Sequence, residues 1–369
     1  MSQTGEVRRR RGRGRTAPLQ LDLTLRPRTR YDAIDVTERV RQAHGDALTP
    51  YRRALYCSYH TTAGYLEQSL SRRLQHRREQ LDPFIAAFRA LFPPDADYRH
   101  DRLDLRTELS EEQRRVEPRN ADSHLAFIGS GLLNCVTYIN RPGEPVYFMD
   151  LDGVNGDTAR TRHTTVLAYD DEETVTETRF AVPVSRHPID SINLADPRVG
   201  LVPFIEDLVA RHGVAKGRVD ITLDPEEHNA GLTVNEHETL LMRHDLAEVL
   251  RDPLKFAMRA GKRALADPRA IPAKSLGYAM YDVVHIVNQL MDALRISESA
   301  VERLLARFMA VPAARFLRLK RSATFLVSDH AEPGRGALVQ GRYQSPILLQ
   351  WSASAERRRV LRLGLRSFT

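Results

Sequence analysis

The stretch Tyr59-His60-Thr61-Thr62-Ala63-Gly64 lies where an apolar, strand-like run over residues 54–59 gives way to small and hydroxylated residues. A histidine at the end of a rigid strand and the start of an open turn is well placed to act as a ligand or a general base. The same position suits a histidine that packs at a strand end, hydrogen-bonded and inert. The hexapeptide alone favours the inert interpretation, so the rest of the chain has to decide.

The composition is that of a soluble globular protein. The chain has 369 residues, of which 42% are hydrophobic and 7% aromatic, and this length is ample for two domains. No run approaches the roughly 18 apolar residues of a membrane span, and the N-terminal region lacks the apolar segment of a secretory signal. Cys57 and Cys135 are the only cysteines, too few for a disulfide framework. We therefore expect a cytoplasmic protein without membrane contact.

Most of the net charge of +7 comes from one segment, because residues 8–15 contain six arginines. Such a segment cannot bury a core, so residues 1–17 are predicted to form a disordered, arginine-rich arm. Two interpretations are open for it. The arm is either a solubilising tail or a weak contact for nucleic acid, which would bind through the release of counterions.

Short strands mixed with a few helices predict an α+β fold. Leucine alternates with other residues over 19–25, which is the period of a strand. Thr37 is a candidate N-cap for a helix that starts near residue 36, and Asp122 or Ser123 is a candidate cap for another. Further strands are expected at residues 132–139, 145–150 and 160–169, and a helical pattern covers 64–92. This order is typical of a β-sheet sandwich with packed helices, not of alternating βαβ units.

The pattern starts again after the acidic run 170–173. Strands are expected at 176–184 and 218–223, with a helix at 201–212, and residues 227–231 then resemble residues 60–64. Ala230 lies 167 positions after Ala63, whereas Arg359 lies 197 positions after Arg162. The sequence thus predicts a tandem duplication with domains at 18–170 and 175–369. The extra residues of the second copy predict a helical insertion at about 255–318.

Three histidines of the first copy, His60, His100 and His124, stand in polar, non-periodic settings. They come from a strand end, a loop and a helix start, which could converge as a three-histidine metal site. Asp101 and nearby aspartates could orient such ligands or act as bases. His163 opens a second His-Thr-Thr triplet, but it lies inside a predicted strand, and we interpret it as a coincidental match.

Residues 18–170 resemble the YjbQ-like family, the secondary thiamine-phosphate synthases. The motifs that carry the resemblance occur in the family's order, and they are His60-Thr61-Thr62-Ala63, Asp97-Tyr98-Arg99-His100-Asp101, Asp122-Ser123-His124-Leu125 before Gly129-Ser130-Gly131, and Asp150-Leu151-Asp152-Gly153 before Arg160 and Arg162. The resemblance implies an α+β fold with a mixed sheet and a homo-oligomer. It also implies that His60, His100 and His124 form the metal or catalytic group, with a divalent metal, zinc ahead of magnesium.

Residues 175–369 resemble the same family more faintly, through residues 230–236 and through Gly341-Arg342-Tyr343-Gln344. Aligning the two copies places Glu227 at the position of His60. Each copy lacks motifs that the other keeps, and two explanations are open. The copies decayed independently, or they divide the work, so that the first-copy histidines meet Asn235, Glu236, Tyr343 and Gln344 across an interface.

The family activity would displace pyrophosphate from an activated pyrimidine by a thiazole phosphate. The resemblance then makes His60, Asp101 and Glu236 catalytic, and it gives substrate binding to a larger set: Thr61, Thr62, Arg160, Arg162, Asn235, Tyr343 and Gln344. Three histidines suit zinc, whereas pyrophosphate chemistry usually uses magnesium. Transfer or hydrolysis on another small phosphorylated metabolite is therefore a rival. A second rival is a non-catalytic binding or assembly module that uses the arm and the insertion.

Overall fold

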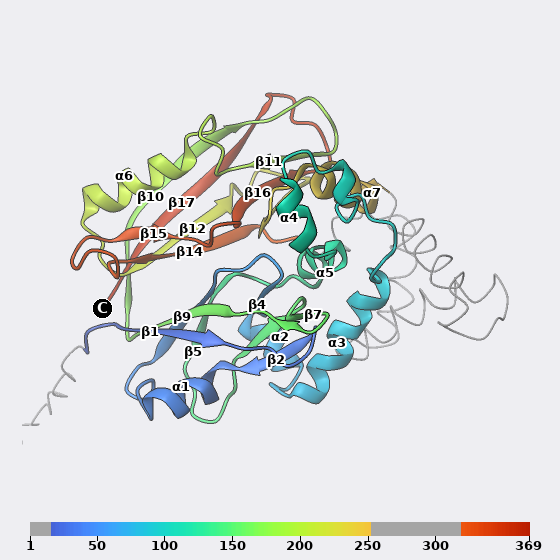
Figure 1. The fold of residues 1–369 in the computed structure, drawn as a ribbon. Helices are drawn as coiled ribbons and strands as arrows, with labels where there is room; N and C mark the ends of the chain where they lie inside the picture. The colour runs from blue at the N-terminus through green and yellow to red at the C-terminus, as the bar shows by residue number, and fades with distance from the viewer. Residues whose placement is uncertain (1–15, 252–318) are drawn as a thin grey trace, which may run out of the picture.

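The computed structural model describes residues 16–251 and 319–369 (Figure 1). The arginine-rich run of the predicted arm lies outside the described residues, as does the predicted helical insertion at about 255–318. Within the described ranges, no helix is long and apolar enough to cross a membrane.

The N-terminal half, residues 16–171, contains two principal antiparallel sheets. The larger has the order β1 (Leu19–Leu25), β9 (Arg162–Tyr169), β3 (Arg53–Ser58) and β5 (Cys135–Ile139). The smaller has the order β2 (Asp32–Asp35), β6 (Tyr147–Asp150) and β4 (Ala63–Tyr65). A two-stranded ribbon, β7 (Val154–Asn155) and β8 (Thr158–Ala159), extends the chain between β6 and β9. The predicted α+β class is confirmed.

The helices of this half are α1 (Val36–His44), α2 (Gln68–Arg73), α3 (Arg78–Leu91), α4 (Glu111–Val116) and α5 (Ala121–Ser130), with a 3-10 turn at Leu103–Leu105. Residues 64–92 are thus not one helix, because Gly64 lies in β4 and the positive φ angles of Gln75 and His76 separate α2 from α3.

Two predicted helix caps were also wrong. The side chain of Asp35, not Thr37, accepts the hydrogen bond from the Glu38 N–H at the start of α1. Asn120 precedes α5, and its side chain makes no capping bond there. In both helices the N-cap residue lies earlier in the chain than predicted, at Asp35 for α1 and at Asn120 for α5.

The C-terminal half, residues 172–369, also contains two antiparallel sheets. The larger has the order β10 (Glu172–Pro183), β17 (Arg358–Phe368), β12 (Gly217–Leu223), β14 (Ser322–Ser328) and β15 (Ala337–Val339). The smaller has the order β11 (Asp190–Asn193), β16 (Ser345–Gln350) and β13 (Ala230–Asn235). Within residues 172–251 and 319–369, the helices are α6 (Leu201–His212) and α7 (Leu246–Arg251), the latter preceded by a π-helical turn at Leu241–Asp245.

The two halves share a strand order. In each half, the larger sheet begins with its first strand in sequence, followed by its last strand and then its second strand. In each smaller sheet, the middle strand is the last in sequence. The registers agree as well, since Ala63 lies opposite Asp150 in β6 just as Ala230 lies opposite Gln350 in β16.

Period-two alternation in β3 explains how the halves pack. Ala54 and Tyr56 belong to the core inside the N-terminal half, whereas Leu55 and Cys57 belong to a cluster shared with Leu326 of β14 and Phe368 of β17. The larger sheets of the two halves therefore face each other across an apolar interface, and Figure 1 shows the two halves stacked in this way.

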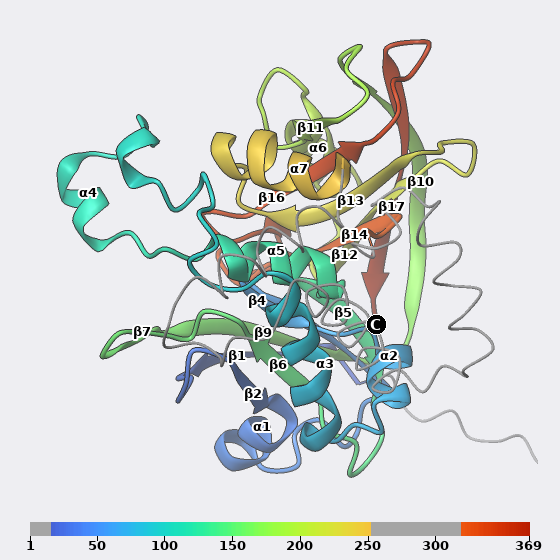
Figure 2. The same cartoon turned by 90° about the vertical axis from the view of Figure 1, so that its right-hand side faces the viewer.

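A third core joins the smaller sheets through helices. It combines apolar residues of α3 and α5 with Met149 of β6 and with α7, Ile347 and Leu349 of the C-terminal half. Figure 2 shows α5 between the two halves, and all ten of its residues are buried. A polar residue on α5 is therefore placed where both halves can contact it.

Candidate active site between the two halves

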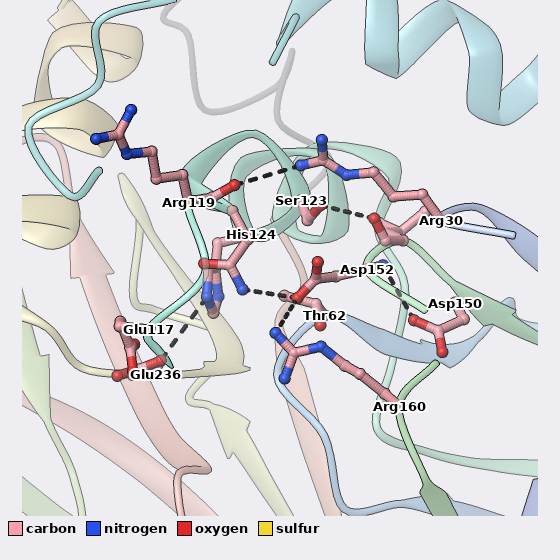
Figure 3. Close-up of polar contacts among 12 residues, drawn as sticks. Arg30, Thr62, Glu117, Arg119, Ser123, His124, Asp150, Asp152, Arg160 and Glu236 are labelled. Atoms are coloured by element: carbon pink, nitrogen blue, oxygen red, sulfur yellow. Dashed lines mark hydrogen bonds and ion pairs between the residues drawn. The ribbon is translucent and has the colours of Figure 1, made fainter. Parts of the chain in front are cut away.

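His124 is the central polar residue of this junction. It lies on α5 and is buried, and its Nδ1 is 2.7 Å from Oδ1 of Asn235 at the end of β13. Its Nε2 is 3.7 Å from Oε2 of Glu236, the next residue along the chain. Figure 3 shows Glu236 facing the imidazole of His124. One half thus supplies the ring and the other half supplies both of its polar partners.

Asn235 connects His124 to the turn that carries His60. The Asn235 side-chain Nδ2 donates to the carbonyl oxygen of Thr61 at 2.9 Å, and its Oδ1 also accepts from the backbone N–H of Glu236 at 2.8 Å. Because a carbonyl oxygen needs a donor and a backbone N–H needs an acceptor, the amide of Asn235 has only one orientation that satisfies both.

His100 lies beside His124, with ring centroids 5.2 Å apart, but both of its nitrogens are occupied. Nδ1 is 3.1 Å from Glu238 Oε2, and Nε2 is 3.2 Å from Asn120 Oδ1. Since Asn120 donates its amide N–H to Asp152, its oxygen must face His100. His100 therefore donates from both nitrogens, which is the pattern of an imidazolium.

The charges of His100 and Glu238 agree with this pattern. Burial is the largest single influence and lowers the pKa of His100, but the hydrogen bond to Glu238 and the charges of Asp101 and Glu236 together outweigh it, and the net direction is upward. Burial raises the pKa of Glu238, yet the hydrogen bond from His100 and those from the Leu240 and Leu241 N–H groups lower it to about 2. The two side chains form a buried ion pair between the halves.

His124 and Glu236 have the opposite character. Burial and the neighbouring charge of His100 hold the pKa of His124 well below its usual range, so the ring is neutral. Burial raises the pKa of Glu236, despite the nearby charges of His100 and Arg106. A neutral imidazole thus faces a carboxyl group that keeps its proton to a higher pH than an ordinary glutamate does.

His60 lies in the same region but in a different contact. Its Nε2 accepts a hydrogen bond from the backbone N–H of His163 at 2.8 Å, and the two imidazole rings stack. Burial and the charge of Arg162 lower the pKa of His60 to about 3. His163, interpreted from the sequence as a coincidental match, is therefore the partner that holds the His60 ring.

The turn that carries His60 is fixed by the C-terminal half. Gln344 Nε2 donates to the carbonyl oxygens of Ser58 and His60, both at 2.9 Å, and Gln344 Oε1 accepts from the Gly341 N–H. Gly341 approaches so closely that a Cβ on it would lie 2.0 Å from the Tyr59 oxygen. The second half therefore positions the His60 turn by direct contact.

The two predicted arginines differ in exposure and in their contacts, because Arg162 is buried and Arg160 is partly exposed. Arg162 is buried and donates to both carboxylate oxygens of Asp150, to the Asp152 carbonyl and to the Thr62 hydroxyl. Arg160 pairs with Asp152 at 2.6 Å, is 32% exposed in its side chain, and has no hydrogen-bond partner for Nε among the described residues. Its charge lowers the pKa of both His60 and His124, so it lies near both.

A second guanidinium, that of Arg106, reaches the site from the loop before α4. It lies 3.6 Å from Glu236 and 3.1 Å from Glu117, and its side chain is 2% exposed. Figure 3 shows Glu117 beside Glu236. The carboxyl of Glu236 is therefore placed between one imidazole and one fixed positive charge.

The three predicted metal ligands do not present three lone pairs to one point. His60 Nε2 already accepts an N–H, and His100 is protonated on both nitrogens, so His124 Nε2 is the one lone pair of the three without a donor. Within residues 16–251 and 319–369, no group of three or more His, Cys, Asp or Glu side chains is placed to hold a metal ion. The residues in this arrangement do not fit a three-histidine zinc site.

The remaining predicted residues have other contacts. Asp101 accepts from the Ala121 N–H at the start of α5, and burial raises its pKa. Thr61 contributes its carbonyl oxygen and Thr62 its hydroxyl to the contacts described above. Tyr343 is 61% exposed and packs under Arg342 of its own turn, so it does not take part in the junction.

Comparison with solved structures gives matches that each cover about half of this chain. A YbjQ-like protein of unknown function from Sulfolobus solfataricus is 15% identical, covers 53% of this chain and 99% of its own, and has a TM-score of 0.29. An uncharacterized conserved protein of the YjbQ family from Clostridium acetobutylicum is 12% identical over 51% of this chain and 98% of its own, with a TM-score of 0.26. The chain resembles YjbQ-like proteins.

A hypothetical protein from Aeropyrum pernix matches in the same manner, with 16% identity, 51% of this chain, 96% of its own and a TM-score of 0.26. No protein-family model matches the chain, and no curated protein matches it.

His60 has a clear counterpart in the second half. Glu227 Oε1 accepts from the Val360 N–H at 2.7 Å, just after Arg359, as His60 Nε2 accepts from the His163 N–H just after Arg162. Glu227 thus makes in the C-terminal half the contact that His60 makes in the N-terminal half.

Sequence reasoning missed Arg106, Asn120, Glu238 and Asp245. Asp245 accepts from the backbone N–H groups of Arg99 and His100, both at 2.9 Å, and so holds the His100 loop from the other half. The signal for Asp245 was available, because it lies at a buried position in an apolar helical pattern with Leu241, Met242 and Leu246. Asn235 ends β13, and the helical turn that carries Asp245 begins at Leu241.

Proposed function

We propose that the chain is a small-molecule enzyme with a site between its two halves, which performs transfer or hydrolysis on a phosphorylated metabolite. The observation that carries this proposal is the pairing of His124 with Glu236 across the junction. A neutral imidazole and a carboxyl of raised pKa, held face to face, are the two groups that general acid–base chemistry needs.

The proposed roles follow from the protonation states. His124 Nε2 has a lone pair and accepts a proton from the attacking water or acceptor group. Glu236, with its raised pKa, returns a proton to the leaving oxygen. Arg160 pairs with Asp152 through Nη2 and its side chain is 32% exposed, so we assign its guanidinium to binding phosphate oxygens.

This proposal assigns different roles to several residues from those the family resemblance implies. Arg162 is buried and uses its Nε and Nη2 groups on Asp150, Asp152 and Thr62, so its proposed role is to maintain the site. His60 is neutral and its Nε2 accepts the N–H of His163, so its proposed role is to line the site near Arg160 without taking part in proton transfer. Glu236 keeps the catalytic role that was predicted for it.

A turnover assay over a panel of phosphorylated metabolites tests the proposal, with release of phosphate or pyrophosphate as the readout. The panel includes the pyrimidine pyrophosphate and thiazole phosphate pair of the family. Glu236→Gln is expected to lower kcat by about 10²–10⁴-fold, the usual size of an acid–base contribution, because glutamine has no proton to transfer. Its affinity for inorganic pyrophosphate, measured by calorimetry, is expected to change little.

Arg160→Gln is expected to do the reverse and weaken pyrophosphate binding. Arg366→Gln is the matched control, because Arg366 of β17 is similarly exposed and pairs with Asp220 of β12 in the larger C-terminal sheet. Wild-type turnover in Glu236→Gln would refute the acid–base role. Equal affinities in all three variants would refute the role of Arg160.

The divalent metal stays a prediction. The contacts of His60 and His100 argue against a three-histidine site in this arrangement. Metal analysis of the purified protein tests it directly. One zinc per chain that is lost in His60→Ala would support the prediction and require both rings to rearrange. Wild-type protein without zinc would contradict it. The homo-oligomer and the nucleic-acid contact of the arm also stay predictions.

We also propose that the two halves arose by tandem duplication. The shared strand orders support this, as do the paired contacts of Arg162 and Arg359. Arg162 donates to Asp150 and to the Asp152 carbonyl, and Arg359 donates to Gln350 and to the Ser352 carbonyl. Among the two sequence-based explanations, the contacts of Asn235, Glu236 and Gln344 with the first half favour division of labour.

A further inference from the structure

Asn235 and Gln344 were predicted to bind substrate, but their amide groups are already used by the protein. Asn235 Oδ1 has two donors, His124 Nδ1 and the Glu236 N–H, and its Nδ2 has the Thr61 carbonyl. Asn235 is also completely buried. A side chain in this state acts on the site through the groups that it holds, not through a ligand.

We infer that Asn235 is a positioning residue that fixes His124 in the tautomer with the proton on Nδ1, so that the second half determines which nitrogen of the first half's histidine carries the lone pair. The Thr61 carbonyl and the Glu236 N–H set the orientation of the amide, and the amide oxygen then requires a donor from His124 Nδ1. A neutral imidazole has one proton, so Nε2 is left with the lone pair, directed at Glu236.

The surroundings of His124 support a neutral ring with this proton placement. His100 is the imidazolium of the pair, it lies 5.2 Å away between ring centroids, and a second positive charge beside it would be repelled. Burial in α5 also disfavours the charged form of His124. Without Asn235, no acceptor among the described contacts of His124 holds the proton on Nδ1, and a neutral imidazole without such a partner prefers the form protonated on Nε2.

The consequence for chemistry rests on the proposed function. A proton on Nε2 would remove the base that faces Glu236, whereas a proton on Nδ1 preserves it. Asn235, the residue that decides between these forms, is in the C-terminal half. A first half without its partner would therefore retain His60, His100 and His124 and still lack a defined base.

Nitrogen NMR of the full chain tests the tautomer without any substrate. In protein labelled with ¹⁵N-histidine, protonated and lone-pair ring nitrogens have distinct chemical shifts. The chain has 13 histidines, and the signals of His124 are identified by their loss in His124→Gln. Wild-type protein is expected to show a protonated Nδ1 and a lone-pair Nε2 at His124.

Two variants of Asn235 separate positioning from mere packing. Asn235→Ala removes the acceptor and is expected to make the Nε2-protonated form the main one. Asn235→Asp keeps an acceptor of the same shape, so it is expected to retain the proton on Nδ1. Asn193→Ala is the control, because Asn193 lies in β11 of the same half, where its side chain accepts only from the Ala195 N–H among the contacts described. It should leave the His124 signals unchanged.

A protonated Nε2 in wild type, or an unchanged pattern in Asn235→Ala, would overturn the inference. If Asn235→Ala does not fold, the wild-type and Asn235→Asp spectra still decide. The proposed function fails separately, through wild-type turnover in Glu236→Gln, because the NMR pattern does not depend on any reaction.

Discussion

His100 shows how a single buried residue stabilises the junction. It is fully buried, donates to Glu238 from one nitrogen and to Asn120 from the other, and its backbone N–H reaches Asp245. The contacts with Glu238 and Asp245 join the two halves, and the contact with Asn120 lies within the N-terminal half. Removing one partner of such a pair leaves the other charge buried without compensation, which costs more than the pair itself contributes.

His100→Leu is therefore expected to destabilise the chain by about 3–5 kcal/mol, the usual range for breaking a buried pair. Denaturation with urea measures the change. The double variant His100→Leu/Glu238→Leu should recover part of the loss, because it removes both charges. His44→Leu is the control, since His44 is exposed at the end of α1. A loss no larger than that of the control would contradict the ion pair.

The pH dependence of this loss has a definite sign. The pKa of His100 is raised in the folded protein, so its contribution is fully present below the ordinary histidine pKa of about 6.5 and is lost as pH rises through the higher folded-state value. The stability difference between wild type and His100→Leu should therefore shrink with rising pH above about 6.5. A difference that grows with pH in this window would contradict the assignment.

At the scale of elements, the contact of the 341–344 turn with the His60 turn depends on one glycine. Gly341 has no Cβ, and a Cβ there would lie 2.0 Å from the Tyr59 carbonyl oxygen and 2.7 Å from its carbon. Both are backbone atoms, so no side chain can move aside to relieve the clash. The close approach lets Gln344 reach the carbonyl oxygens of Ser58 and His60.

Gly341→Ala is expected to lower stability by about 1–3 kcal/mol or more, as overpacking does, and to displace the His60 turn. Urea denaturation measures the first effect. The ¹⁵N-histidine spectrum measures the second, through the His60 ring signals. Gly364→Ala is the matched control in β17, where a Cβ would meet no atom within 4 Å. Equal effects of the two substitutions would show that the turns do not press on each other as described.

At the scale of the whole molecule, two shared cores make the halves one cooperative unit. One core lies between the larger sheets, around Leu55, Leu326 and the stacked rings of Tyr169 and Phe368. The other combines helices of both halves, and Trp351 packs against it. Neither half keeps its apolar surface covered without the other.

Leu55→Ala is therefore expected to destabilise both halves together, by about 2–5 kcal/mol for a buried leucine. Trp351 is the only tryptophan and lies in the C-terminal half, so its fluorescence reports unfolding there, while circular dichroism reports the whole chain. Both midpoints should fall equally, although the substitution is in the N-terminal half. Val116→Ala, at a side chain that is 80% exposed, is the control. A circular dichroism transition that shifts while the Trp351 transition does not would show independent halves.

Local pattern determined the α+β class, the period-two strand β1, the full length of α6 and the polar settings of the histidines, because these depend on residues near one another in sequence. The alignment of Ala63 with Ala230 also placed Glu227 where His60 has its counterpart. The tertiary structure alone decided what these residues do. It placed Asn235 and Glu236 against His124, bonded His60 to the His163 N–H and made His100 a cation, because these proton positions and lone pairs depend on partners more than one hundred residues away.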